Sequence, residues 1–210
     1  SLSVHEQILF AIHARLQDNV DLCGGADRFL EGDFPVREWD LVADELLLCY
    51  KNLPAIKKTT NWTSTHYRDQ LVGEIILALD HAGRENEATD LALSEVEQTC
   101  NYERLVRRLL RLGQRDDAMA WIARGIAATG KSLPGIAARL ADIQRELWEK
   151  EGDWVHVAGV RAEDFLCSPT FLTCRRLETT AQKAGLWESV RPSVMQYLES
   201  GKLPRMEKND

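Results

Sequence analysis

The 210-residue chain lacks the features that mark membrane proteins, disulfide-stabilised proteins and dedicated nucleic-acid binders. No stretch approaches the ~20 uninterrupted apolar residues that a membrane-spanning helix requires. The five cysteines are an odd number without a C-x-x-C pair, which indicates a reducing cytoplasm rather than a disulfide framework. With 26 Lys and Arg against 33 Asp and Glu, the net charge is −7. Because nucleic-acid binders gain affinity by neutralising phosphates, this balance argues against that class.

Signatures of catalysis and of metal binding are also missing. No H-E-x-x-H accompanies His5 or His13, and Cys167 and Cys174 lack a nearby histidine, whereas structural zinc needs closely spaced ligand pairs. Gly24-Gly25 is not followed by the further glycines or the Lys-Ser/Thr of a phosphate-binding loop. We therefore expect a protein that is not an enzyme and uses no metal or cofactor. The alternative is a helical enzyme or small-ligand-binding domain without a recognisable motif.

Glycine and proline are scarce, at 19 of 210 residues, and the apolar residues recur with the period of an α-helix. Apolar residues recur three and four apart, with charges between them, over 36–50, 68–79 and 136–148. Hardly any stretch alternates apolar and polar residues as a half-buried strand would. The pattern predicts an all-α protein of about ten helices joined by short connections.

Four glycines, Gly83, Gly113, Gly152 and Gly185, mark an internal repeat with spacings of 30, 39 and 33 residues. Five residues after each stands a small or β-branched side chain, and mostly apolar side chains stand four and eight residues before it. These positions are Ala88, Ala118, Val157 and Val190 after the glycines, Leu79, Leu109, Trp148 and Ala181 four before them, and Ile75, Leu105, Gln144 and Leu177 eight before them.

This register has a physical explanation in a helical hairpin. Glycine ends the first helix because it enters the left-handed conformation without a Cβ penalty, and the small residue lets the second helix pack closely. One hairpin cannot bury both of its faces, so hairpins stack. We therefore predict a right-handed α-solenoid with a divergent helical segment at 1–60, repeats at 61–200 and a flexible tail at 201–210.

The register resembles that of tetratricopeptide repeats. Residues 81–88 (HAGRENEA) and 111–118 (RLGQRDDA) are the best matches, and the tryptophans two residues after Gly152 and Gly185 echo the family's aromatic after the turn. The small residue that the family places seven before the glycine is absent here, and the spacing is irregular. The resemblance therefore implies degenerate, tetratricopeptide-like repeats.

A more specific similarity covers about residues 30–204. It is carried by segments 78–84 (ALDHAGR), 102–106 (YERLV), 121–126 (WIARGI), 151–154 (EGDW) and 197–201 (YLESG). Together they resemble the helical C-terminal region of bacterial SWIM zinc-finger proteins. In that family a C-x-C…C-x-H motif precedes the repeats, and these 210 residues contain none, so no zinc ligand is assigned. The resemblance implies one arm of a larger zinc-finger protein, and because the chain does not begin with methionine, we expect any zinc module ahead of Ser1.

One helix runs against the acidic average. Over residues 101–112 there are four arginines and one acid, a local balance of +3. The stripe consists of Arg104, Arg107, Arg108 and Arg111, with Arg115 just beyond. Matched to a tetratricopeptide hairpin, positions six and two before the turn glycine line the concave surface. The basic residues at these positions are His81, Arg107, Arg111, Lys150 and Lys183.

A groove with these basic residues favours an acidic protein segment, because guanidinium groups present a fork to carboxylates. We therefore expect a non-catalytic scaffold that binds a protein partner through His81, Arg107, Arg111, Lys150 and Lys183. One alternative is a solvated face of weak ion pairs without a function. Another is auxiliary nucleic-acid binding through the stripe at 104–115.

Overall fold

The computed structural model describes residues 2–18, 22, 24–54 and 62–202, without the side chains of residues 62–64. These residues form eleven α-helices and no strand, which confirms the all-α prediction. The helices are α1 (Val4–Gln17), α2 (Gly24–Leu30), α3 (Val36–Lys51), α4 (Trp62–His81), α5 (Glu85–Thr99), α6 (Tyr102–Arg111), α7 (Arg115–Thr129), α8 (Pro134–Glu151), α9 (Trp154–Cys167), α10 (Phe171–Lys183) and α11 (Trp187–Ser200).

The chain divides into two compact units, Ser1–Ile136 and Ala137–Asp210. The segments predicted from the sequence, 1–60, 61–200 and 201–210, follow repeat character rather than compactness, and they stay a prediction. From residue 203 onward, the tail lies outside the described residues.

All four repeat glycines adopt the left-handed conformation, with φ between 71° and 74°. Each ends its helix with the same pair of hydrogen bonds. At the first turn, the Gly83 N–H donates to the Asp80 carbonyl (3.1 Å) and the Arg84 N–H donates to the Leu79 carbonyl (2.8 Å). The equivalent two bonds close the turns at Gly113, Gly152 and Gly185. This is the Schellman motif, and it confirms the helix ends that the glycines predict.

The small residues of the register lie where two helices meet. Ala88, Ala118 and Val157 are fully buried, and Val190 is half-buried. In the first two hairpins, α4–α5 and α6–α7, the apolar side chains four and eight residues before the glycine are buried as well. In the third hairpin, Gln144 and Trp148 occupy those positions and are only half-buried. The core is therefore most regular where the repeat pattern is clearest.

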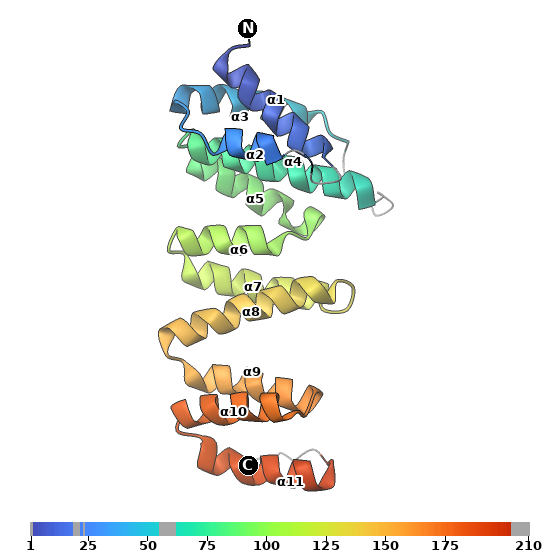
Figure 1. Ribbon diagram of the computed structural model, residues 1–210, viewed down its shortest axis with the longest axis vertical. Coiled ribbons are helices and arrows are strands. Elements are labelled where there is room, and N and C mark those ends of the chain that lie inside the picture. The colour runs from blue at the N-terminus through green and yellow to red at the C-terminus, as the bar shows by residue number, and fades with distance from the viewer. Residues whose placement is uncertain (1, 19–21, 23, 55–61, 203–210) are drawn as a thin grey trace. The chain divides into compact units, whose positions relative to one another are not determined.

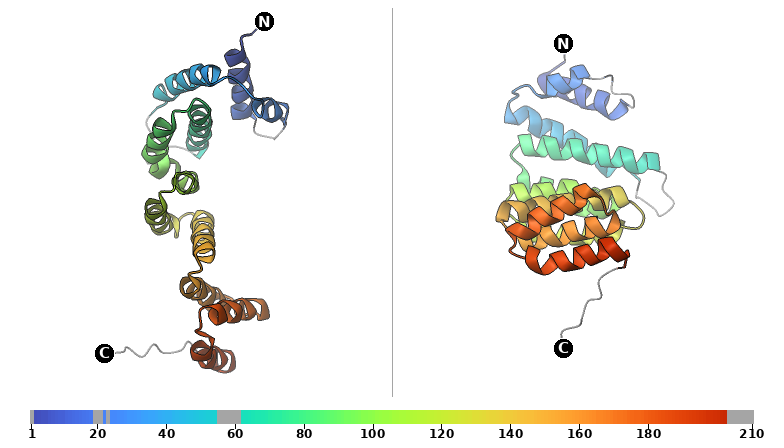
Figure 2. Two further views of the ribbon diagram at one scale, coloured as in Figure 1. Left: turned by 90° about the vertical axis from the view of Figure 1, so that its left-hand side faces the viewer. Right: turned by 60° about the horizontal axis from the view of Figure 1, so that its bottom comes forward.

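In the first unit, consecutive helices from α3 to α7 pack on one another, the contact pattern of a helical-repeat solenoid (Figure 1). An end-on view places α4 and α6 in one layer and α5 and α7 in another (Figure 2, left). Helix α1 departs from this order because it contacts α2, α3 and α4. The right-handed sense of the solenoid stays a prediction.

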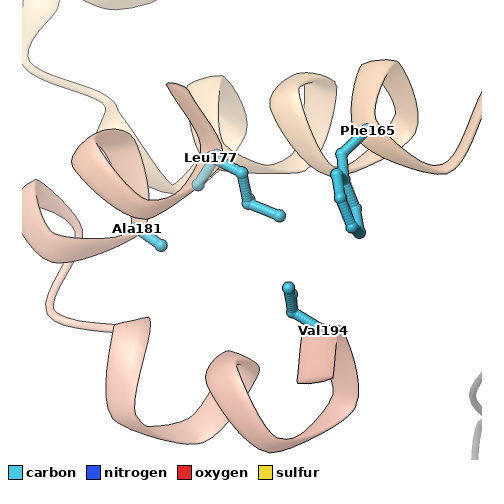
Figure 3. Close-up of a cluster of buried hydrophobic side chains, with 5 residues drawn as sticks. Phe165, Leu177, Ala181 and Val194 are labelled. Atoms are coloured by element: carbon cyan, nitrogen blue, oxygen red, sulfur yellow. The ribbon is translucent and has the colours of Figure 1, made fainter. Parts of the chain in front are cut away.

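The second unit has a small core of its own. Helix α10 packs against both α9 and α11. Phe165 of α9, Leu177 and Ala181 of α10, and Val194 of α11 point into a common space (Figure 3). Toward α8, the Trp148 ring stacks on His156 of α9 with centroids 4.9 Å apart. These contacts pack α9, α10 and α11 together, and the ring stack links α8 to α9.

The turn glycines allow a stability test. At Gly113 the space around an added Cβ is empty, so the Gly113→Ala variant meets only the conformational cost of φ +73°. We expect it to lower the free energy of unfolding by about 1 kcal/mol. Chemical denaturation followed by circular dichroism measures the change.

Gly159→Ala is the matched control, because Gly159 lies inside α9 and its Cβ would also meet empty space. Its φ is not positive, so alanine there should raise stability by up to about 1 kcal/mol. Destabilisation of similar size at both sites would show that the left-handed turn is not what Gly113 provides.

Candidate functional site

Three of the five predicted groove residues lie in the first unit. His81 ends α4 and stacks on the Trp39 ring of α3, with centroids 4.4 Å apart. Arg107 of α6 has a side chain 62% exposed and pairs with Glu103 at 2.8 Å. Arg111, 52% exposed, reaches Asp80 at the end of α4 at 3.1 Å. The structure thus brings the last turns of α4 and α6 together.

Lys150 and Lys183 belong to the second unit, where both are exposed. The Lys183 ammonium lies 3.9 Å from the centroid of the Trp154 ring, a cation–π contact between α10 and α9. Lys150 stands in the last turn of α8. Within its own unit, each lysine is available to solvent.

Two arginines of the basic stripe form ion pairs with carboxylates of a neighbouring helix. Arg108 has a side chain only 3% exposed and donates to both carboxylate oxygens of Asp80 (2.8 and 2.9 Å), to the Thr89 hydroxyl and to the Glu85 carbonyl. Arg104 pairs with Asp69 of α4 at 2.8 Å. Together they join α6 to α4, and Arg108 also joins it to α5. Carboxylates of α4 therefore neutralise part of the +3 charge of this helix. Arg107 and Arg111 are the arginines of the helix whose side chains are exposed.

A second buried ionic cluster joins α3, α4 and α5. The Arg68 guanidinium donates to both Glu95 oxygens, at 2.6 and 2.8 Å, and the Tyr50 hydroxyl donates to Glu95 at 2.7 Å. Burial alone would raise the pKa of Glu95, but the hydrogen bonds from Arg68 and Tyr50 and the Arg68 charge outweigh it, so the pKa lies below its usual value. This carboxylate is therefore a structural anion.

A polar cavity of about 440 Å³ opens between α1, α4 and α6. Helix α4 provides one wall, and α1 and α6 each contribute an arginine. The lining residues are Arg15, Leu16, Gln70, Gly73, Glu74, Leu77 and Arg104. Leu77 stands six before its turn glycine, the position that Arg107 holds in the next repeat. The cavity therefore includes a groove position that the repeat register predicts.

Glu74 is the unusual group in this cavity. The residue is only 8% exposed, and its Oε1 lies 3.4 Å from the Arg15 guanidinium. Its Oε2 is buried without a hydrogen-bond partner among the described residues. Burial, the largest influence, raises the pKa of Glu74 above its usual value. A buried oxygen without a partner costs free energy, so Oε2 does not contribute to the stability of the fold.

Gly73 explains how Arg104 fits beside Glu74. A Cβ at position 73 would lie 3.2 Å from the Arg104 Nη2, closer than side chains normally approach. Glycine inside a helix costs about 1 kcal/mol relative to alanine. Here the glycine leaves room for the Arg104 guanidinium. Asn101 donates to Asp69, the ion-pair partner of Arg104, at 3.1 Å. The local sequence therefore positions Arg104 at the cavity wall.

Sequence reasoning missed Glu74, Arg15 and Gln70. One signal was present, because Glu74 and Arg104 both stand nine residues before a turn glycine, but the prediction used only the positions six and two before it. An interior glycine at 73 was a second signal. Nothing in the sequence indicated that Arg15, far away in α1, would reach α4.

Among the described residues, no group of three or more His, Cys, Asp or Glu side chains could hold a metal ion. None of the helices built from those residues is both long and apolar enough to cross a membrane. Comparison with protein-family models, with curated proteins and with solved structures gave no match. The similarity to SWIM zinc-finger proteins therefore stays a prediction from the sequence.

Proposed function

We propose that this protein is a non-catalytic helical-repeat scaffold that binds an acidic segment of a partner protein on the face formed by α4 and α6. The observation that carries the proposal is the exposure of Arg107 and Arg111 beside each other on α6, while Arg104 and Arg108 hold that helix in place. The resemblance to the SWIM family adds the proposal of one arm of a larger, cytoplasmic zinc-finger protein.

The ion pairs of Arg107 and Arg111 do not prevent such binding. Exposed pairs contribute about 0–1 kcal/mol because water and salt screen them and both side chains lose freedom. Carboxylates of a partner can therefore replace Glu103 or share these guanidinium groups. Arg107 and Arg111 are one turn apart, a spacing that an extended or helical acidic segment can match.

A peptide-display selection on the purified protein tests the proposal. We expect acidic sequences to be enriched, and the best of them to bind the Arg107→Glu/Arg111→Glu variant at least about tenfold more weakly, since charge-assisted hydrogen bonds are worth ~1.5 kcal/mol or more each. Isothermal titration calorimetry measures the affinities.

Arg28→Glu/Arg37→Glu is the matched control, because it changes the net charge equally at exposed arginines of α2 and α3. This control should bind the acidic peptides within about twofold of the parent once salt screens long-range charge. Enrichment of neutral or basic sequences, or equal loss in both variants, would reject the proposal. Oligonucleotide binding that falls steeply with salt would favour the nucleic-acid alternative.

A further inference from the structure

We infer that the cavity between α1, α4 and α6 binds an uncharged carboxamide group, the side chain of an asparagine or glutamine. That this side chain belongs to the partner's acidic segment rests on the proposed function. Arg107 and Arg111 would bind charged groups of the segment, and the cavity would recognise a neutral side chain next to them.

The acceptor in the cavity is the Glu74 carboxylate. Arg15 lies near Oε1, so Oε2 is the atom that remains unsatisfied by the described residues. A buried carboxylate oxygen strongly favours an N–H or O–H donor, because only a hydrogen bond recovers its lost solvation. Glu74 lines the cavity, so a ligand that reaches its carboxylate there is favoured when it presents a donor.

The donors are guanidinium groups at the other walls. Arg15 is tied to Asp27 at 3.2 Å and Arg104 to Asp69 at 2.8 Å, so each is held in a fixed position by a carboxylate outside the cavity lining. Guanidinium carries five N–H donors, more than these contacts use. A ligand carbonyl can therefore accept from Arg15 or Arg104 while its donor faces Glu74.

This arrangement disfavours both signs of charge. An ammonium group that reached Glu74 would lie beside the Arg15 and Arg104 guanidinium groups, and a carboxylate that reached the arginines would lie beside the buried Glu74. Like charges at such distances in a partly buried site are strongly unfavourable. A carboxamide has one acceptor and two N–H donors without a net charge, so it satisfies both kinds of wall.

Size and position fit a side chain of a bound segment. The volume of about 440 Å³ exceeds that of one side chain, and Leu16 and Leu77 offer apolar contacts for its methylene groups. Arg104 stands one helical turn before Arg107 on α6, so the cavity borders the face that carries the exposed arginines. A segment lying along α6 can therefore place an amide side chain in the cavity.

The test uses N-acetyl-glutamine N-methylamide as the probe, with the equivalent capped glutamate, lysine and methionine as controls. We expect saturable, millimolar binding of the glutamine probe at neutral pH, seen as NMR shifts of the Gly73 backbone amide and the Gln70 side-chain amide. The controls should shift these signals at least about fivefold less. Equal shifts from the methionine or charged probes, or no shift at all, would overturn the inference.

Two variants separate the site from the fold. Glu74→Met should lose the glutamine probe and raise the melting temperature by about 2–4 °C, because it removes a buried oxygen without a partner. Gly73→Ala keeps Glu74 but should weaken the probe severalfold by displacing Arg104. Unchanged probe binding in both variants would place the amide elsewhere and reject the cavity.

The Arg107→Glu/Arg111→Glu variant distinguishes this inference from the proposed function. The probe is uncharged, so its affinity for that variant should stay within about twofold. If the probe fails while acidic peptides bind, the carboxamide site is wrong and the scaffold proposal stands. If the probe binds while acidic peptides fail, the cavity stands and the acidic partner is wrong.

Discussion

Replacing Ala118 by glutamate is expected to lower the free energy of unfolding of the first unit by about 4 kcal/mol or more. Ala118 is fully buried in α7, where that helix packs against α6. A carboxylate there would have neither space nor a partner, and burying an unpaired charge is among the most destabilising single changes. Since whole domains are stable by only about 5–15 kcal/mol, thermal and urea unfolding would show a large shift.

Ala120→Glu is the matched control on the same helix. Ala120 is exposed, so glutamate there should change stability by less than about 0.5 kcal/mol. If Ala118→Glu unfolded at the same temperature as Ala120→Glu, the register that places a small residue five positions after each turn glycine would be wrong.

Glu95→Leu is expected to have the second large effect, a loss of about 3–5 kcal/mol. It would leave the Arg68 guanidinium, whose side chain is 11% exposed, without its carboxylate partner. Removing both partners in Arg68→Leu/Glu95→Leu should cost less than Glu95→Leu alone, because no uncompensated charge remains. Urea titration of the parent, both single variants and the double variant gives the coupling. A double variant less stable than Glu95→Leu would contradict this account of the cluster.

The same cluster predicts a pH dependence. Because the pKa of Glu95 is lower in the folded chain than in the unfolded chain, its contribution to stability is present above the unfolded value. The contribution is lost as the pH falls from there through the folded pKa. The parent should therefore lose more stability than Glu95→Leu over that acidic range. Parallel pH profiles of the two proteins would contradict the assignment.

The turns could be predicted from the sequence because they are local. A Schellman turn depends on the glycine and on the backbone of the residues just before it, and the small residue five positions later belongs to the same hairpin. Gly83 and Gly113 therefore locate both helix ends and buried positions. In the third hairpin, Gln144 and Trp148 weaken the apolar pattern, and the burial there is correspondingly partial.

The charged network could not be predicted, because its partners are far apart in the chain. Counting charge along one helix gives +3 for residues 101–112, yet Arg104 and Arg108 pair with Asp69 and Asp80, 35 and 28 residues away. Periodicity shows which side of a helix carries charge. It does not show which carboxylates the next helix presents to that side.

The cavity could not be predicted either, because the residues that line it are far apart in the chain. Its unpaired carboxylate becomes visible only when α1 is placed against α4, because Arg15 then reaches one oxygen of Glu74 and leaves the other without a partner. The two signals within α4, the interior Gly73 and the position nine residues before the turn glycine, do not show that Glu74 is buried or that Arg15 reaches it. Sequence alone therefore predicted a binding face but not the most unusual group beside it.

The most direct test of the central claim, that a partner lies on the α4–α6 face, is amide hydrogen exchange with a selected acidic peptide bound. A partner on this face should slow exchange in α4 and α6, with no change in α5 and α7. Protection concentrated in α5 and α7, or bound peptide without protection in α4 and α6, would contradict it.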